Sequence, residues 1–259
     1  KWFKLKYNLI EAKKLGYKTL LTFGGAYSNH IAATAFSAKE KRFKSIGIIR
    51  GEEHLPLNPT LAVARENGME LHYVSRSDYR LKATPKFLDN LKAQFGNFYL
   101  LPEGGANELA IKGTEEILDA SDTQDYICCP VGTGGTIAGI INASDSIQQV
   151  IGFPAIKRSD VLEKDIRNWM NKQNYKFINN YNCGGYAKTN EKLVQFINQF
   201  NEVHNIPLDA IYTGKMMLGV MDLIKWDYFP KGSSILAIHT GGLQGNKGMS
   251  ERLGVKLPS

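Results

Sequence analysis

Residues 127–139 read Ile-Cys-Cys-Pro-Val-Gly-Thr-Gly-Gly-Thr-Ile-Ala-Gly, and this stretch decides the fold. An apolar strand over residues 127–131 runs into a turn of three glycines and two threonines, and a helix follows from Thr136. The N–H groups of such a turn and the positive end of the helix dipole converge on one point, where they attract an anion. The sequence therefore predicts a phosphate site at residues 132–136, which we call the phosphate cup.

The kind of phosphate follows from what the phosphate cup lacks. A dinucleotide fingerprint needs glycine or alanine at its sixth position, but Ile137 stands there, and no acidic residue follows about 20 positions on. The Gly-Lys-Ser/Thr end of a Walker loop is also absent. The cup suits a single phosphate monoester, and a tight glycine-rich turn without a ligand is the alternative interpretation.

Strand and helix alternate along most of the chain. Apolar runs predict strands over residues 19–23, 45–49, 70–74, 98–101, 126–131, 149–153 and 234–239. Helical spacing and helix-end signals predict helices over residues 5–15, 29–41, 58–68, 86–95, 108–118, 160–171, 190–204 and 215–225, and one from residue 136. This order is typical of an α/β protein with parallel sheets. We expect a small α/β domain over residues 10–97, inserted into a larger domain of residues 1–9 and 98–259.

Composition and charge exclude several classes of protein. With 259 residues, 43% hydrophobic and 22% charged, the chain is composed like a globular protein, not a disordered, collagen-like or disulfide-rich one. The net charge of +7 raises the question of nucleic acid, but the basic residues form no run of five, so we expect a solvated face and no nucleic-acid partner. No stretch approaches the roughly 20 apolar residues of a membrane span, and no signal peptide is visible.

Cysteine usage and the start of the chain carry two further expectations. Cys128, Cys129 and Cys183 form neither a paired framework nor a metal-ligand spacing, which fits a reducing compartment such as the cytoplasm. The chain starts at Lys1, without Met and in what reads as mid-element, so we expect the N-terminal part of the larger domain to be missing.

Four glycine-rich turns follow predicted strands. Ligands of open α/β sheets lie beyond the carboxyl ends of the strands, so these turns are the candidate ligand sites. They are Gly24-Gly25-Ala26-Tyr27-Ser28-Asn29-His30, Glu103-Gly104-Gly105-Ala106-Asn107, Gly132-Thr133-Gly134-Gly135-Thr136 and Thr240-Gly241-Gly242.

Six segments, taken in order, resemble the family of D-cysteine desulfhydrases and 1-aminocyclopropane-1-carboxylate (ACC) deaminases. They are the first and third of these turns, together with Lys1-Trp2-Phe3-Lys4-Leu5-Lys6-Tyr7, Gly184-Gly185-Tyr186, Tyr212-Thr213-Gly214-Lys215 and His239-Thr240-Gly241-Gly242. The family lies within the tryptophan-synthase-β-like enzymes that use pyridoxal 5'-phosphate (PLP). The resemblance implies the type II PLP fold, with two parallel-sheet α/β domains and the cofactor between them. It also implies a homodimer, as is typical of relatives.

The resemblance assigns roles to individual residues. Lys1 would hold PLP as a Schiff base and move the Cα proton of the substrate. Asn29 would hydrogen-bond the pyridoxal 3-oxygen, and Thr213 would face the pyridine nitrogen. The phosphate would be bound by Thr133, Gly134, Gly135 and Thr136. The substrate would be faced by Ser28, His30, Tyr186 and Tyr212, of which Ser28 and the two tyrosines are also candidate catalytic groups.

Some of these residues have plainer interpretations. Taken alone, Ser28 and Asn29 would be helix-capping residues, and Tyr186 and Tyr212 would be core residues. Lys4 is expected to be a solvated residue of the first helix.

Thr213 separates the two activities of the family. The resemblance implies glutamate at this position in ACC deaminases and threonine in desulfhydrases. A carboxylate keeps the pyridine nitrogen protonated and makes the ring a full electron sink, whereas a neutral hydroxyl need not. We therefore expect a PLP-dependent lyase that converts D-cysteine to pyruvate, hydrogen sulfide and ammonia. The alternatives are ACC deamination, a β-substituted alanine such as D-serine as substrate, and a protein that binds PLP or an amino acid without turnover.

Overall fold

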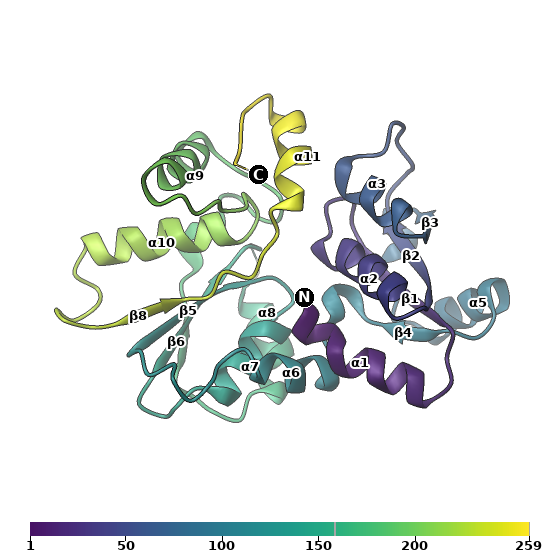
Figure 1. Ribbon diagram of the computed structural model, residues 1–259, viewed down its shortest axis with the longest axis horizontal. Coiled ribbons are helices and arrows are strands. Elements are labelled where there is room, and N and C mark those ends of the chain that lie inside the picture. Colours follow the sequence, from purple (N-terminus) through teal and green to yellow (C-terminus); the bar gives the residue numbers. More distant parts are fainter. Residues whose placement is uncertain (158, 259) are drawn as a thin grey trace. The chain divides into compact units, whose positions relative to one another are not determined.

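A computed structural model describes residues 1–157 and 159–258, and the chain forms two compact units (Figure 1). The first unit is Lys1–Leu109 and the second is Ala110–Ser259. Each unit contains one four-stranded sheet in which every pairing is parallel. The predicted α/β class is confirmed.

The sheet of the first unit has the strand order β3-β2-β1-β4. Its strands are β1 Thr19–Gly24, β2 Lys44–Arg50, β3 Met69–Val74 and β4 Tyr99–Leu101. Its helices are α1 Trp2–Lys14, α2 Asn29–Glu40, α3 Pro59–Glu66, α4 Arg76–Tyr79, α5 Pro85–Phe95 and the 3-10 turn η1 Glu103–Gly105. The helix α6 Glu108–Glu115 begins in the last two residues of this unit and continues into the second. Leu21 and Phe23 of β1 pack with α4 and α5 residues, while Leu20 packs with α1 and α2 residues, so the sheet is covered on both faces.

The helices of the first unit begin where short polar side chains cap them. Asn58 Oδ1 accepts the N–H groups of Thr60 and Leu61, and Pro59 takes the first-turn position, where its missing N–H costs nothing. Thr84 caps α5 in the same way. These caps explain why the sequence predicts helix starts to within one residue there.

The sheet of the second unit has the strand order β7-β6-β5-β8. Its strands are β5 Tyr126–Val131, β6 Gln149–Pro154, β7 Tyr175–Phe177 and β8 Ile235–Ala237. Its other helices are α7 Gly135–Ala143, α8 Ser159–Ile166, the 3-10 turns η2 Arg167–Trp169 and η3 Asn179–Tyr181, α9 Glu191–His204, α10 Thr213–Lys225 and α11 Gln244–Leu253.

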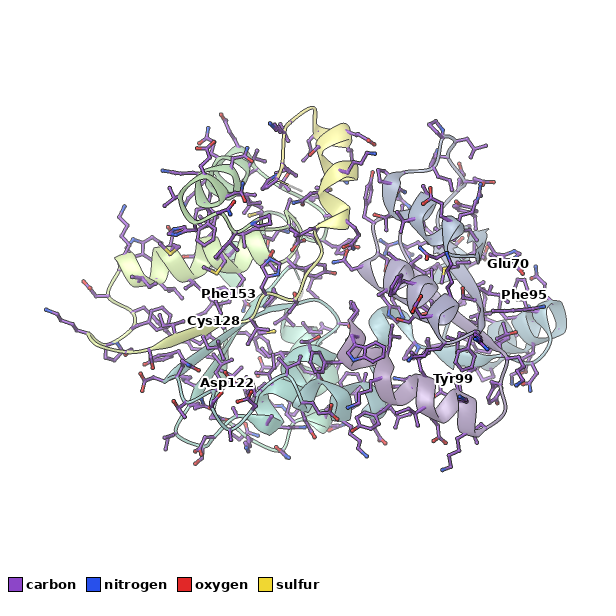
Figure 2. All side chains as sticks on the ribbon, viewed as in Figure 1. Glu70, Phe95, Tyr99, Asp122, Cys128 and Phe153 are labelled. Atoms are coloured by element: carbon purple, nitrogen blue, oxygen red, sulfur yellow. The ribbon has the colours of Figure 1, made fainter. Side chains whose placement is uncertain are left out.

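Alternate residues of β5 serve two cores in the second unit. Cys128 packs with Phe153 and with residues of α9, α10 and α11, and both labelled side chains can be found in Figure 2. Ile127 and Cys129 pack with residues of α6, α7 and α8 on the other face. The unit therefore has three layers, with helices on both faces of the sheet. The strand β5 lies between β6 and β8, and the phosphate cup follows directly after the carboxyl end of β5.

The structure differs from the sequence prediction in a few elements. The helices α4 and α11 and the strand β7 were not predicted, and the helix expected over residues 160–171 is divided into α8 and η2. The unit boundary also differs from the expected inserted domain, because α1 packs on Leu20 and Leu101 of the first sheet, which places residues 1–9 and 98–109 in the first unit. Within residues 1–157 and 159–258, no helix combines the length and the apolar character that a membrane span requires.

Candidate active site

The phosphate cup lies between the end of β5 and the start of α7. Gly134 is the N-cap of α7, its φ is +82°, and no side chain caps the helix. The helical hydrogen bonds start with Ala138 N, which donates to Gly134 O at 3.0 Å. The N–H groups of the first turn have no acceptor within the helix, and a phosphate is an anion that such a turn attracts.

The glycines of the cup are required by its walls. A Cβ on Gly134 would lie 2.3 Å from Ile166 Cγ2, and one on Gly132 would lie 3.0 Å from Tyr212 Cε1 and 3.2 Å from its hydroxyl oxygen. Any larger residue at 134 would also be strained by the positive φ. The bare backbone at 132 lets the ring of Tyr212 lie directly against the cup.

Tyr186 and Tyr212 face one another beside the cup. Their ring centroids are 6.3 Å apart, and the ring planes are inclined by 60°. Both residues are half-buried. The structure thus brings together the cup and both predicted tyrosines within the second unit.

Lys215 holds the loop that carries Tyr186, and sequence reasoning did not assign it a role. The side chain is 1% exposed, and its Nζ donates to Asn182 O and Gly185 O, each at 2.8 Å. Desolvation by burial lowers the pKa of Lys215 to about 8. Because Lys215 stands one turn after Tyr212 in α10, it links the two tyrosine-bearing segments.

Asp209 holds the turn that carries Tyr212 and Thr213, and it too was missed. Its Oδ2 accepts the N–H groups of Ile211 at 2.9 Å and Tyr212 at 3.0 Å, and its Oδ1 accepts the Thr213 N–H at 2.7 Å and the Thr213 hydroxyl at 2.8 Å. The Asp209 N–H donates back to Thr213 Oγ1 at 2.8 Å. Thr213 is fully buried, with its hydroxyl bonded twice to Asp209. A short acidic residue just before a predicted helix was the available signal.

In the first unit, Ser28 and Asn29 stand at the start of α2. Ser28 is the N-cap, and its Oγ accepts the Ile31 N–H at 3.3 Å, so the capping interpretation applies to it. That bond leaves the hydroxyl hydrogen of Ser28 uncommitted. Both residues are half-buried.

His30, one position further, is 1% exposed. The Thr22 hydroxyl donates to Leu101 O at 3.0 Å, so at its 2.8 Å contact with His30 Nε2 it accepts, and the imidazole carries its hydrogen on Nε2. The lone pair of Nδ1 is buried without a partner. Burial lowers the pKa of His30 well below 6.5, and the charges of Lys1 and Lys4 lower it further, so the ring is neutral at pH 7.

Lys1 and Lys4 converge on one backbone carbonyl. Lys1 Nζ donates to Gly104 O at 3.3 Å and Lys4 Nζ donates to the same oxygen at 2.7 Å. The expectation that Lys4 is solvated is wrong, because the residue is 2% exposed. Lys1 has an exposed surface, while desolvation of its ammonium lowers its pKa to about 8.

The predicted residues thus form two groups, one in each unit. Lys1, Ser28, Asn29 and His30 belong to the first unit, and Thr133, Gly134, Gly135, Thr136, Tyr186, Tyr212 and Thr213 belong to the second. The second group has the donors of a phosphate site, and the first has a lysine with the lowered pKa that suits a nucleophilic amine. These residues fit a phosphorylated aldehyde cofactor. Among the described residues, no three His, Cys, Asp or Glu side chains gather as metal ligands.

Comparison with known proteins agrees with this fit. The model of a family described as "Pyridoxal-phosphate dependent enzyme" matches residues 1–241. A "Putative 1-aminocyclopropane-1-carboxylate deaminase" of Pyrococcus abyssi is 29% identical over 93% of this chain and 79% of its own length. The "Bifunctional D-cysteine desulfhydrase/1-aminocyclopropane-1-carboxylate deaminase, mitochondrial" of Arabidopsis thaliana is 28% identical over 93% of this chain and 68% of its own. A crystal structure of an "ACC deaminase homologue" is 26% identical with a TM-score of 0.83, over 97% of this chain and 82% of that one.

Proposed function

The chain belongs to the family of pyridoxal-phosphate-dependent enzymes, and from that premise we propose that it is a lyase acting on a small amino acid, with D-cysteine as the favoured substrate. The observation that carries the proposal is the phosphate cup, with Tyr212 packed against Gly132 and Tyr186 beside it. The reaction consumes one water and yields pyruvate, hydrogen sulfide and ammonia.

The residues of this chain divide the work between binding and proton transfer. Residues 133–136 would hold the phosphate, Asn29 the 3-oxygen and Lys1 the aldehyde carbon of PLP. When bound, PLP withdraws electrons from the substrate Cα and so weakens its C–H bond. Lys1 would take the Cα proton, since a pKa of about 8 leaves part of its amine neutral near that pH.

Substrate orientation would come from Ser28 and the two tyrosines. The Ser28 hydroxyl has a hydrogen to donate to the substrate carboxylate, because its bond to Ile31 uses an acceptor site. Tyr186 and Tyr212 would line the substrate pocket. Holding the Cα–H bond perpendicular to the cofactor ring decides which bond breaks, so these contacts set the reaction.

ACC deamination to 2-oxobutanoate and ammonia is the second candidate function. It is favoured by the names of the relatives, several of which carry ACC deaminase in their name. D-cysteine is favoured by Thr213, which puts a hydroxyl where the resemblance places the carboxylate of deaminases. We further propose that the protein is a cytoplasmic homodimer and has no nucleic-acid partner. Light scattering measures the mass in solution, and the mass of a single chain would contradict the dimer.

Keto-acid release on the two substrates tests the proposal. The chain is incubated with PLP and either D-cysteine or ACC, and pyruvate and 2-oxobutanoate are separated and quantified. We expect pyruvate from D-cysteine and none of the ACC product. Release of 2-oxobutanoate from ACC alone would replace the favoured function with the second candidate, and no product from either substrate would contradict both.

A further inference from the structure

We propose that Lys215 is a positioning residue, whose buried ammonium holds residues 182–188 in the conformation that keeps Tyr186 against Tyr212. We call residues 182–188 the tyrosine loop. The inference rests on the proposed function, in which the two tyrosines line the substrate pocket. Both rings lie beside the phosphate cup, since Tyr212 lies against Gly132 and the ring centroids of the tyrosines are 6.3 Å apart.

The backbone of the tyrosine loop is in a disfavoured conformation. The φ angles of Cys183 and Ala187 are +50° and +52°, although both residues carry a Cβ, and those of Gly184 and Gly185 are +89° and +118°. A positive φ is unfavourable for residues other than glycine, because the Cβ then lies too close to a backbone carbonyl oxygen. Such a segment persists only where the surrounding structure holds it, so the tyrosine loop depends on contacts beyond its own residues.

The tyrosine loop forms two consecutive turns. The Gly185 N–H donates to Asn182 O at 2.9 Å, and the Lys188 N–H donates to Gly185 O at 3.2 Å. The Asn182 side chain supports the first turn, because its Oδ1 accepts the Gly184 N–H at 2.9 Å. These bonds use one lone pair of each turn carbonyl, and the second lone pair of each can accept a hydrogen bond from outside the loop.

Lys215 donates to both of these turn carbonyls. Its Nζ lies 2.8 Å from Asn182 O and 2.8 Å from Gly185 O, and the side chain is 1% exposed. Burial lowers the pKa of Lys215 to about 8, so most of the amine is charged at pH 7. One ammonium therefore ties the two turns together directly before Tyr186.

The anchors at other points of the loop limit what Lys215 controls. Lys215 lies in the first turn of α10, whose N-cap is Tyr212, so its ammonium links the loop to the helix that carries the second tyrosine. Arg252 of α11 donates to Ala187 O, which holds the far end of the loop. Loss of the Lys215 ammonium should therefore release the middle of the loop, and with it Tyr186, while the fold of the unit remains.

The first test reads the surroundings of Tyr186 without substrate. The tyrosines are replaced by 3-fluorotyrosine, and the ¹⁹F signal of Tyr186 is identified by its loss in Tyr186→Phe. The matched control is Lys192→Met, because Lys192 Nζ donates to Asp222 Oδ2 at 3.0 Å and not to the loop. We expect the Tyr186 signal to shift or broaden in Lys215→Met and to stay unchanged in Lys192→Met.

A second test replaces the ammonium. Lys215→Ala removes the part of the side chain that n-propylammonium can supply from solution. We expect n-propylammonium to restore the wild-type ¹⁹F signal of Tyr186 in Lys215→Ala. Tetramethylammonium carries the same charge but has no N–H to donate to the two carbonyls, so we expect no restoration with it.

A double-variant cycle tests whether Lys215 acts on turnover through Tyr186. A misplacement of about 1 Å can cost on the order of 100-fold in rate, so we expect Lys215→Met to lower kcat/KM by about 10- to 100-fold. Tyr186→Ala removes the ring that Lys215 places. In the Tyr186→Ala chain, adding Lys215→Met should lower kcat/KM by less than about twofold, because the two residues act as one unit.

Several outcomes would overturn the inference. An unchanged ¹⁹F signal of Tyr186 in Lys215→Met would do so, as would an equal loss of kcat/KM on adding Lys215→Met to the wild type and to Tyr186→Ala. Equal restoration by both ammonium ions would contradict the role of the two hydrogen bonds. If Lys215→Met does not fold, Lys215→Ala prepared in n-propylammonium decides, and absence of the wild-type signal there overturns the inference.

The proposed function fails separately. If Lys215→Met moves the Tyr186 signal but the wild-type chain releases no keto acid, the inference on the loop stands and the function is lost. If the wild-type chain releases keto acid and Lys215→Met neither moves the signal nor lowers kcat/KM, the function stands and the inference is lost.

Discussion

Gly134→Ala should weaken PLP binding through one identifiable contact. Gly134 has a φ of +82°, and its added Cβ would lie 2.3 Å from Ile166 Cγ2. A left-handed residue other than glycine costs about 1 kcal/mol, and overpacking adds about 1–3 kcal/mol. The chain can relieve the overlap only by moving Ile166 or the cup.

The effect on PLP affinity follows from a movement of the phosphate cup. If the backbone of the cup withdraws enough to lose one N–H bond to the phosphate, the loss is about 1.5–3 kcal/mol for a bond to a charged group. Each 1.4 kcal/mol is tenfold in Kd, so we expect PLP to bind about 10- to 100-fold more weakly. Absorbance titration with PLP measures the Kd, and urea unfolding measures the stability.

Two controls separate the clash from the backbone strain. Gly232→Ala carries the strain alone, since Gly232 has a φ of +91° and nothing lies within 4 Å of its Cβ position. The double variant Gly134→Ala/Ile166→Ala removes Cγ2 and should regain part of the affinity. The reasoning is refuted if Gly134→Ala binds PLP like the wild type, or if Gly232→Ala loses as much affinity.

The remaining predictions concern buried polar groups and the lysines. Thr22→Val leaves the His30 Nε2–H without its acceptor and should lower the free energy of unfolding by about 1–3 kcal/mol. Thr34→Val removes a buried hydroxyl that has no hydrogen-bond partner and should not lower it. Urea unfolding of the two variants and the wild type measures the difference. The pKa of Lys215 is lowered from 10.5 to about 8, so between pH 8 and 10.5 the unfolded chain binds more protons than the folded chain. The wild type should therefore gain up to about 3 kcal/mol in free energy of unfolding, relative to Lys215→Met, as the pH rises from 8 to 10.5. An equal pH dependence in both proteins would contradict this. Lys1→Ala should abolish turnover and the absorbance of bound PLP, and Lys13→Ala, in the last turn of the helix that Lys1 precedes, should change neither.

The parts of the fold that the sequence predicts are those with local causes. Buried parallel strands are continuous apolar runs, so β1, β2, β5 and β6 were predicted to within one residue at each end. The strand β7 is Tyr175–Phe177, in which Lys176 separates the two aromatic residues, so it lacks the apolar run that marks β4 and β8. The helix α11 is polar and contains Gly245 and Gly248, which hide its helical spacing.

The same distinction holds for the candidate site. The phosphate cup follows from its own glycines and threonines. Asp209 bonds the turn that directly follows it, so its signal is local. Lys215 and Lys4 instead donate to backbone oxygens of distant segments, and no local pattern announces such contacts. Lys4 was expected to be solvated because lysine usually is, but Gly104 O, a hundred residues away, receives its ammonium.

The central claim, a PLP enzyme whose cofactor is held by Lys1, is tested most directly by finding where PLP attaches. The chain is incubated with PLP, reduced with borohydride and digested, and fragment ions locate the added pyridoxyl mass. We predict that the mass lies on the side chain of Lys1. A label on Lys4, or none on either lysine, would contradict the claim.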